Sequence, residues 1–336
     1  MTRLFIAIAT TSIGCTEEKT ANCETPSWTN VSLNSESSWY GEVVGAWGNE
    51  PGKMHLVGVS GQHLIGGGED WQVLSDEGSS PEFKSLWGAA ENDLFAITVE
   101  NEIWRFDGSN WNPEFTGVES GALLAIHGSS ADNVYAVGRD ASSASGIAYR
   151  RNASGWEAIS PPAGYAFRSV FSQAQDDVWL VGDNGYTAHY NGTDWTLHDS
   201  TTERDLNTIW VMGSNRAFAA GGDWVPYTDD GQGIILSFNG SAWSVDKADT
   251  WTVFDAMWGS GDDDVWAVGD VPDEEDPDGR IWHYDGLDWQ EHDRIWNAPN
   301  AIWGTGPQDV YAVGFGGNAD HNLHHYGCRQ PQTNTE

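Results

Sequence analysis

Seven copies of one short pattern run through this chain and limit what it can fold into. The pattern reads "MWGSGDDDVWAVG" from Met257 and "IWGTGPQDVYAVG" from Ile302. The other five copies begin at Ala46, Leu86, Ile126, Val170 and Ile209. A unit that recurs every ~40–50 residues indicates a structural repeat, either a solenoid or a propeller.

A second pattern follows each copy and completes a unit of four predicted strands. In six units it ends at a tryptophan with constant spacing: Trp71, Trp111, Trp156, Trp195, Trp243 and Trp289. Runs such as "DVWAVG" place apolar side chains at every second residue, the period of a strand, and Gly, Asp, Asn and Ser separate the runs. We expect strand A of each unit to end at the aromatic residue of "IWG" and strand D to begin at the tryptophan. The sequence therefore predicts an all-β, seven-bladed β-propeller with four antiparallel strands per blade.

The seventh unit, "HNLHHYGC", has no tryptophan after it, whereas "SWTNVSL" near the other end carries Trp28 at the head of an alternating run. We therefore expect the N-terminal strand to pair in blade seven and close the ring. Cys23 and Cys328 would then lie beside one turn. In an oxidising compartment we expect a disulfide between them, the alternative being two unpaired thiols.

Acidic residues gather between strands A and B, most densely at Asp262, Asp263 and Asp264. Three successive carboxylates suit a calcium loop, a catalytic acid pair or a solvated turn. The same stretch is acidic in other units, at Asp93, Asp132, Asp176, Asp177 and Asp309. Aspartate in a turn bonds to nearby backbone and tolerates tight geometry. Because the feature recurs from unit to unit, it predicts blade architecture. His189, His283 and His325 also share one repeat position, which predicts a structural role.

The charge balance excludes some partners. The chain has 50 Asp and Glu against 15 Lys and Arg, a net charge of −35. Such a chain repels phosphate, so we expect no nucleic-acid partner and no membrane contact through basic patches. Neither GxSxG nor HExxH occurs. We therefore favour a monomeric binding protein over an enzyme, with no cofactor unless it binds calcium.

The first residues predict export. "MTRLFIAIATTSIGC" has Arg3, a short apolar run and small residues before Cys15, which is the form of a signal peptide. "SIGC" resembles the lipobox of bacterial lipoproteins, which implies a lipidated Cys15 and an outer-membrane location, with plain secretion as the alternative. We expect a signal peptide over 1–14, a tether over 15–24, the propeller over 25–328 and a disordered tail over 329–336.

The units resemble the tryptophan-rich propeller repeats of exported bacterial proteins, with "DVWAVG" followed by "HYDGLDW". They are also similar to Asp-box, photosystem II assembly-factor-like and tectonin propellers. The resemblance covers about 25–328 and implies the architecture, but such folds host enzymes, lectins and scaffolds alike. It also implies that Asp107, Asn191 and Asp285 are turn residues without a catalytic role.

The units differ most in the connection between strands B and C. Blades one, two and four have two residues there, whereas the others insert residues 139–145, 222–232, 270–278 and 315–320. Insertions in repeat proteins gather on one face, often the binding face, and the D–A connections share it. Just inside strand A, one repeat position varies in polarity and should face the channel mouth: Lys84, Arg168, Asn207, Asp255 and Asn300. The predicted ligand-binding residues on this face are Trp224, Tyr227, Asp229, Asp230, Trp251, Trp296, Arg168 and Asp255.

Aromatic rings beside carboxylates suit a sugar or a cationic peptide. The run "DEEDPDG" (273–279) is a solvated acidic loop in our preferred interpretation, and a calcium loop with Asp273, Asp276 and Asp278 in the other. We predict an exported, outer-membrane-anchored binding module for a glycan or protein ligand. The alternatives are an envelope assembly scaffold and a glycan-cleaving enzyme.

Overall fold

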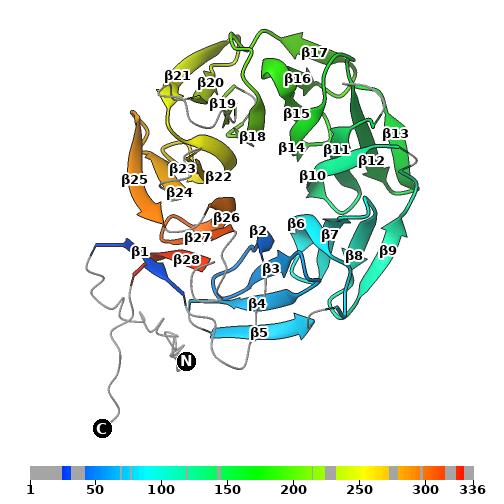
Figure 1. Cartoon of the computed structure of the whole chain (residues 1–336). Coiled ribbons are helices and arrows are strands. Elements are labelled where there is room, and N and C mark those ends of the chain that lie inside the picture. Colours follow the sequence, from blue (N-terminus) through cyan, green and yellow to red (C-terminus); the bar gives the residue numbers. More distant parts are fainter. Residues whose placement is uncertain are drawn as a thin grey trace, which may run out of the picture.

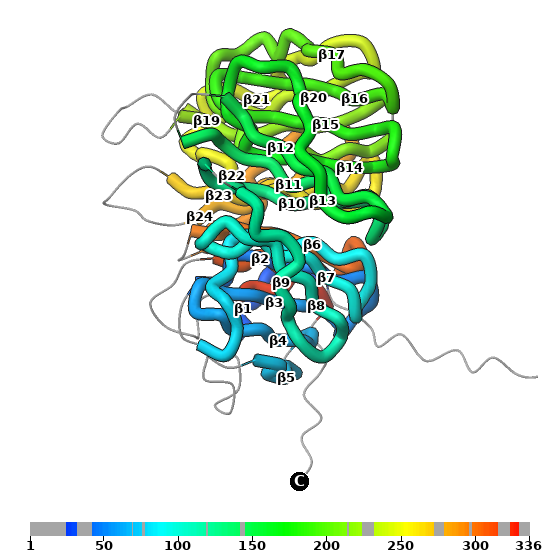
Figure 2. Tube along the Cα trace, turned by 90° about the vertical axis from the view of Figure 1, so that its right-hand side faces the viewer, coloured from blue at the N-terminus to red at the C-terminus, as the bar shows by residue number. Residues whose placement is uncertain are grey.

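The computed structural model describes residues 25–31, 42–68, 70–75, 78–118, 120–141, 145–213, 215–223, 232–271, 279–295, 298–314 and 323–328. Within these ranges the chain forms seven four-stranded antiparallel sheets arranged as blades around a central axis (Figure 1). Figure 2 shows the ring edge-on, with the strands running between its two faces. No helix in the described ranges is long and apolar enough to span a membrane.

The blades follow one another along the chain. Blade one holds β2 (Val43–Trp47), β3 (Met54–Gly58), β4 (His63–Gly67) and β5 (Asp70–Ser75). Blade two holds β6 (Phe83–Ala90), β7 (Asp93–Thr98), β8 (Ile103–Phe106) and β9 (Trp111–Phe115). Blade three holds β10 (Ala122–Ser130), β11 (Asn133–Arg139), β12 (Gly146–Asn152) and β13 (Gly155–Ile159). Blade four holds β14 (Phe167–Ala174), β15 (Asp177–Gly182), the 3₁₀ turn η1 (Asp183–Gly185), β16 (Thr187–Tyr190) and β17 (Trp195–His198).

Blade five holds β18 (Leu206–Val211), β19 (Ala217–Gly222), β20 (Gly233–Phe238) and β21 (Trp243–Thr250). Blade six holds β22 (Val253–Gly261), β23 (Asp264–Asp270), β24 (Gly279–Tyr284) and β25 (Trp289–Ile295). Blade seven holds β26 (Pro299–Gly306), β27 (Asp309–Gly314), β28 (Leu323–Gly327) and β1 (Ser27–Asn30). The predicted all-β propeller is therefore confirmed, and strand D begins at the repeat tryptophan or one residue before it.

The ring closes as predicted, because β1 supplies the outer strand of blade seven beside β28 (Figure 1). Trp28 lies opposite Tyr326 in this antiparallel pair. The Trp28 ring also meets Trp266 of blade six edge-on, with centroids 5.5 Å apart. Cys23 lies outside the described residues, so the Cys23–Cys328 disulfide stays a prediction.

Strand A extends further than the sequence predicted. In blade six, β22 continues past Trp258 to Gly261, which pairs with Asp264. A register shift between Gly259 and Gly261 allows the extra pair and leaves a tight turn at 262–263. A bulge of this kind increases the local twist and adds a residue that the alternating pattern does not reveal.

The acidic stretch is built into the blade, as its recurrence predicted. The Asp264 carboxylate accepts hydrogen bonds from His283 Nε2 (2.7 Å) and Trp266 Nε1 (3.0 Å), and the two rings stack with centroids 4.0 Å apart. Burial alone would raise the pKa of Asp264, but hydrogen bonds from His283, Ser260 and Trp266 outweigh it and hold the pKa below its usual value. Equivalent pairs join Asp177 to His189 (2.8 Å), Asp309 to His325 (2.8 Å) and Asp93 to Arg105 (2.6 Å). We call these four pairs the B–C clamps, because each joins the start of strand B to strand C.

Neighbouring aspartates in this stretch should therefore respond differently to substitution. Asp264→Asn should lower the free energy of unfolding by about 1–3 kcal/mol, because it weakens the hydrogen bonds from His283 and Trp266. Asp262→Asn, with the same charge change in the exposed turn, should change it by less than about 1 kcal/mol. Urea unfolding of both variants measures the difference. Equal losses would contradict the clamp, and loss of ligand binding in a folded Asp262→Asn protein would contradict the structural role of the turn.

The tryptophans of strand A pack on the next blade. A Cβ atom on Gly88 of blade two would lie 2.5 Å from the Trp47 ring of blade one. The same close approach pairs Trp87 with Gly128, Trp210 with Gly259 and Trp258 with Gly304. The "WG" dipeptide of the repeat therefore reflects packing between neighbouring blades, in which the tryptophan ring of one blade lies against the glycine of the next.

Candidate functional site

A β-bulge interrupts strand A of every blade at one equivalent place. In blade six the register of β22 and β23 skips Asp255, between the pairs made by Phe254 and Ala256. The residues skipped in this way are Val44, Lys84, Leu124, Arg168, Asn207, Asp255 and Asn300. A bulge leaves its extra residue out of the ladder and re-aims the side chain, often next to a functional site. We call these seven residues the mouth ring.

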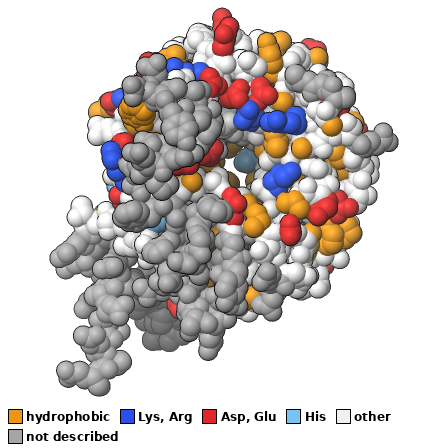
Figure 3. Space-filling view, viewed as in Figure 1, with side chains coloured by type: hydrophobic (Ala, Val, Ile, Leu, Met, Phe, Trp, Pro, Cys, Tyr) orange, Lys and Arg blue, Asp and Glu red, His pale blue; other side chains and the backbone are white. Residues whose placement is uncertain are grey.

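The mouth ring lies at the D–A end of the innermost strands, as predicted for the five polar members. Basic and acidic side chains gather around a central opening on the face seen in Figure 3. The bulge explains why the repeat tolerates Lys, Arg, Asn, Asp, Val and Leu at one position. A side chain that leaves the ladder is not required to pack between two sheets.

Most polar members of the mouth ring tie one blade to the next. Lys84 Nζ donates to the carbonyl of Leu123 in blade three (3.2 Å) and to Asn101 Oδ1 (3.1 Å). Asn207 Nδ2 donates to the carbonyl of Phe254 in blade six (2.9 Å), and Asn300 donates to Glu42 of blade one. Burial lowers the pKa of Lys84, although the negative charge of Glu100 acts in the opposite direction. Burial raises the pKa of Glu42. These side chains hold the inner strands together.

Arg168 is held by three partners. Its Nε donates to Asp183, its Nη2 to Asp205 (2.5 Å) and its Nη1 to Asn207 Oδ1 (3.1 Å). Asp183 begins η1, and Asp205 lies in the D–A connection before β18. Each guanidinium nitrogen thus already donates a hydrogen bond to a protein oxygen. A ligand at the mouth would therefore encounter Arg168 as a positive charge with two carboxylates next to it. The sequence predicted Arg168 at the mouth but offered no signal for its two carboxylate partners.

Asp255 differs from the other polar members because no hydrogen bond joins its carboxyl group to a described residue. Its side chain is exposed to water, although protein surrounds it at the mouth. This enclosure and, secondarily, the carboxyl group of Asp270 raise the pKa of Asp255 to about 7, against the attraction of Arg168. Burial also raises the pKa of Asp270, which ends β23 and was not among the predicted site residues.

Exposed aromatic rings lie on the same D–A connections. Trp251, between β21 and β22, is 54% exposed, and Tyr165, before β14, is 43% exposed. Both are free of the inter-blade packing that occupies the repeat tryptophans. Trp251 was a predicted ligand contact because it lies on a D–A connection, and the structure leaves its ring exposed.

Several predicted site residues lie outside the described part of the chain. They are Trp224, Tyr227, Asp229, Asp230 and Trp296, the calcium candidates Asp273, Asp276 and Asp278, and Cys15. Among the described residues, no group of three or more His, Cys, Asp and Glu side chains could hold a metal ion. The calcium loop therefore stays a hypothesis about residues that the structure does not describe.

Comparisons with known proteins agree on the fold. No family model and no curated protein sequence matches the chain. The chain is similar to the structure of YCF48 bound to D1 peptide, at 16% identity over 90% of this chain and 97% of that one, with a TM-score of 0.64. It is also similar to YCF48 from Cyanidioschyzon merolae (16% identity, 89% and 98% covered, TM-score 0.63) and to the WD40 propeller domain of Doa1 (11%, 92% and 98%, 0.67). At these identities the similarity shows the propeller fold alone.

Proposed function

We propose that this protein is a binding module that recognises a protein ligand at the mouth ring, with a cationic side chain of the ligand paired to Asp255. One observation carries the proposal. Lys84, Arg168, Asn207 and Asn300 all bond to protein, whereas the exposed carboxyl group of Asp255 has no hydrogen bond to any residue that the structure describes. A lysine or arginine side chain would supply the missing donor and favour the ionised carboxylate.

The charge of the whole chain supports the same ligand chemistry. A net charge of −35 attracts cationic surfaces and speeds their encounter with the protein. One propeller of similar fold has been solved with a peptide bound, which supports a peptide ligand by analogy only. In this proposal the chain is exported, and lipidated Cys15 anchors it at the outer membrane.

Asp255→Asn should weaken binding of lysine- or arginine-containing peptides by at least about tenfold, because it removes the charge that the ligand pairs with. An immobilised peptide library identifies peptides that bind the wild-type protein, and calorimetry measures their affinities. Because the pKa of Asp255 is raised to about 7, wild-type binding should strengthen as pH rises from 6 to 8, and Asp255→Asn should lose this dependence.

The matched control is Asp262→Asn, which removes one negative charge from an A–B turn on the opposite face. It should leave the affinity unchanged apart from a small, salt-sensitive effect. Equal weakening by both variants would reduce the effect to net charge and contradict a site at Asp255.

Glycan recognition is the second candidate, favoured by the exposed ring of Trp251 on the connection before β22, the strand that carries Asp255. A flat ring suits the apolar face of a sugar, and carboxylates suit its hydroxyl groups. The electrostatic interaction between the carboxyl groups of Asp255 and Asp270 extends this candidate to glycan cleavage, since glycosidases use one carboxyl group with a raised pKa together with a second one. A glycan array with the wild-type protein and Trp251→Ala tests binding, and polysaccharide turnover with Asp255→Asn tests cleavage. Capture of envelope proteins without either result would favour an assembly scaffold.

A further inference from the structure

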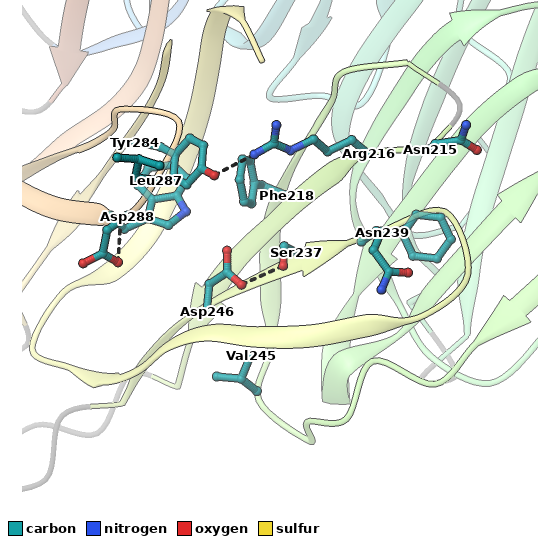
Figure 4. A pocket seen from close by; sticks show the side chains of 12 residues that line it. Asn215, Arg216, Phe218, Ser237, Asn239, Val245, Asp246, Tyr284, Leu287 and Asp288 are labelled. Carbon is teal, nitrogen blue, oxygen red and sulfur yellow. Dashed lines mark hydrogen bonds between the residues drawn. The ribbon is translucent and has the colours of Figure 1, made fainter. Parts of the chain in front are cut away.

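A pocket of about 590 Å³ opens between blades five and six, away from the mouth ring (Figure 4). Strands β19 to β21 form one side, and the turn between β24 and β25 forms the other. Phe218, Tyr284 and Trp289 contribute aromatic rings to its lining, and Arg216 and Ser237 contribute polar groups. We call it the blade-five pocket.

Comparison with the four blades that carry a clamp shows what blade five lacks. In each B–C clamp, an aspartate at the start of strand B pairs with a histidine or arginine of strand C that lies over an aromatic ring of strand B. Blade five changes both members of the clamp. Register with the neighbouring strands places Arg216 where blade six has Asp264, and Ser237 where blade six has His283. Blade five therefore has a cation but lacks the carboxylate, and the small Ser237 leaves space where a ring would stand.

Arg216 keeps the aromatic half of the clamp. Its guanidinium carbon lies 5.6 Å from the centre of the Phe218 ring and 5.3 Å from that of Tyr284. Its Nη2 donates to the Tyr284 hydroxyl group at 2.6 Å, across the boundary between the blades (Figure 4). No described carboxylate pairs with this guanidinium group. A guanidinium has five N–H donors, so Arg216 retains donors for a further acceptor.

The two carboxylates that line the pocket already have partners. Asp246 accepts a hydrogen bond from Ser237 Oγ at 2.6 Å, as Figure 4 shows. Asp288 pairs with Lys247 Nζ at 2.8 Å. The pocket thus combines a cation without a carboxylate partner and carboxylates that are already neutralised or hydrogen-bonded. This arrangement favours an anionic guest over a cationic one.

The rim adds an apolar surface. Leu287, in the turn after β24, is 89% exposed, and Val245 on β21 is 45% exposed. The equivalent turn position holds a small hydroxyl residue in four other blades: Ser109, Ser154, Thr193 and Ser241. An exposed leucine in place of serine or threonine gives an incoming ligand an apolar contact next to Arg216.

We propose that the blade-five pocket binds a carboxylate carried beside an apolar group, with Arg216 as its partner. The guest carboxylate completes the clamp that blade five lacks, because a planar guanidinium pairs with a carboxylate through two parallel hydrogen bonds. The apolar group of the guest lies against Leu287 and Val245. The site shares no residue with the mouth ring, so it stands or fails independently of the proposed function.

Ligand-observed NMR titration with hexanoate tests the proposal, and hexylamine serves as the cationic probe of matched length. Hexanoate should bind the full-length protein and hexylamine should not. Arg216→Gln should weaken hexanoate binding by about tenfold or more, since it removes the charge and the bidentate geometry. The matched control is Arg105→Gln, which removes an arginine of blade two that already has Asp93 as its partner. It should leave hexanoate binding unchanged.

Ser237→His gives a second test that leaves Arg216 in place. It restores the ring of the repeat and fills the hollow, so it should abolish hexanoate binding while thermal unfolding confirms an intact fold. Equal binding of hexylamine, or hexanoate binding that survives in folded Arg216→Gln and Ser237→His proteins, would overturn the proposal. A peptide ending in leucine, its C-terminal amide and an amidated peptide with an internal glutamate then distinguish a chain terminus from an acidic side chain as the source of the carboxylate.

Discussion

Deletion of residues 1–31 should lower the free energy of unfolding by about 3–5 kcal/mol or more, because blade seven then loses its outer strand. Complete truncation of one buried tryptophan alone costs about this much. The deletion removes Trp28, whose ring packs against Trp266 and Tyr326, and Val31, which is buried and donates its N–H to the carbonyl of Leu323. It also exposes the edge of β28, and an unpaired edge strand invites aggregation.

The control is deletion of residues 1–22, which keeps β1 and Cys23 and should unfold like the mature protein. Trp28→Ala should fall between the two deletions, at about 2–3 kcal/mol, since Trp28 is half-buried. Urea unfolding followed by far-ultraviolet circular dichroism measures all three proteins. If both deletions unfolded at the same urea concentration, β1 would contribute nothing to closure.

Acid should destabilise the fold strongly through a buried histidine pair in blade one. His55 and His63 are both fully buried, and their Nδ1 and Nε2 atoms lie 2.9 Å apart. Trp111 Nε1 donates to His63 Nδ1 at 3.2 Å, so His63 carries its proton on Nε2 and donates it to His55. Burial lowers the pKa of His55 to about 4, although the negative charge of Glu91 acts in the opposite direction. Burial also lowers the pKa of His63 to about 3, and repulsion from His55 lowers it further.

The direction of the pH effect follows from these lowered values. Unfolded histidine binds a proton below about pH 6.5, whereas the folded pair stays neutral to about pH 4. The unfolded chain therefore takes up more protons in this window. The stability contributed by the pair is complete above about pH 6.5 and is lost as pH falls toward 4, at up to about 1.4 kcal/mol per pH unit for each histidine.

A double variant isolates this effect from the other titrating groups. Blade two carries Phe95 and Ile103 at the two equivalent positions, so His55→Phe with His63→Ile borrows residues that the repeat already uses. Between pH 7 and pH 4 the wild-type protein should lose about 3–6 kcal/mol more than the double variant, measured by urea unfolding at each pH. Parallel stability curves would contradict a neutral buried pair.

The sequence predicted the blade count, the four strands per blade and the closing strand because those features depend on local patterns repeated many times. Alternating apolar residues set each strand, and constant spacing between turn residues set each unit. Trp28 was recognised as the missing strand because it matches the repeat tryptophan that opens strand D elsewhere. The polar residues of the mouth ring were recognised because one position varied while its neighbours did not.

Other features are visible in the sequence but acquire meaning only from packing. Four tryptophans of strand A each lie against a glycine of the next blade. Where strand A instead has the smaller ring of Phe171 or His127, the next blade has a larger residue at the glycine position, Val211 or Ser172 respectively. His127 Nδ1 accepts the backbone N–H of Ser172 at 3.1 Å. A smaller ring in one blade thus goes with a larger facing side chain in the next blade. The alignment of the repeats shows this relation, but only the packing of the blades explains it.

Tertiary structure alone decided the charge pairing at both candidate sites. Asp183 and Asp205 reach Arg168 from two different connections, and Arg216 reaches Tyr284 from the next blade. The bulges that aim the mouth ring arise from pairing between strands, and a shift of one residue would turn each of these side chains to the other face. Strand identity is a property of a few adjacent residues, so the sequence by itself determined it for this protein. The pairing of each carboxylate with its cation depends on strand register and on the docking of whole blades, so only the folded ring decided that Arg168 would pair with Asp183 and Asp205 and that Arg216 would bond to Tyr284.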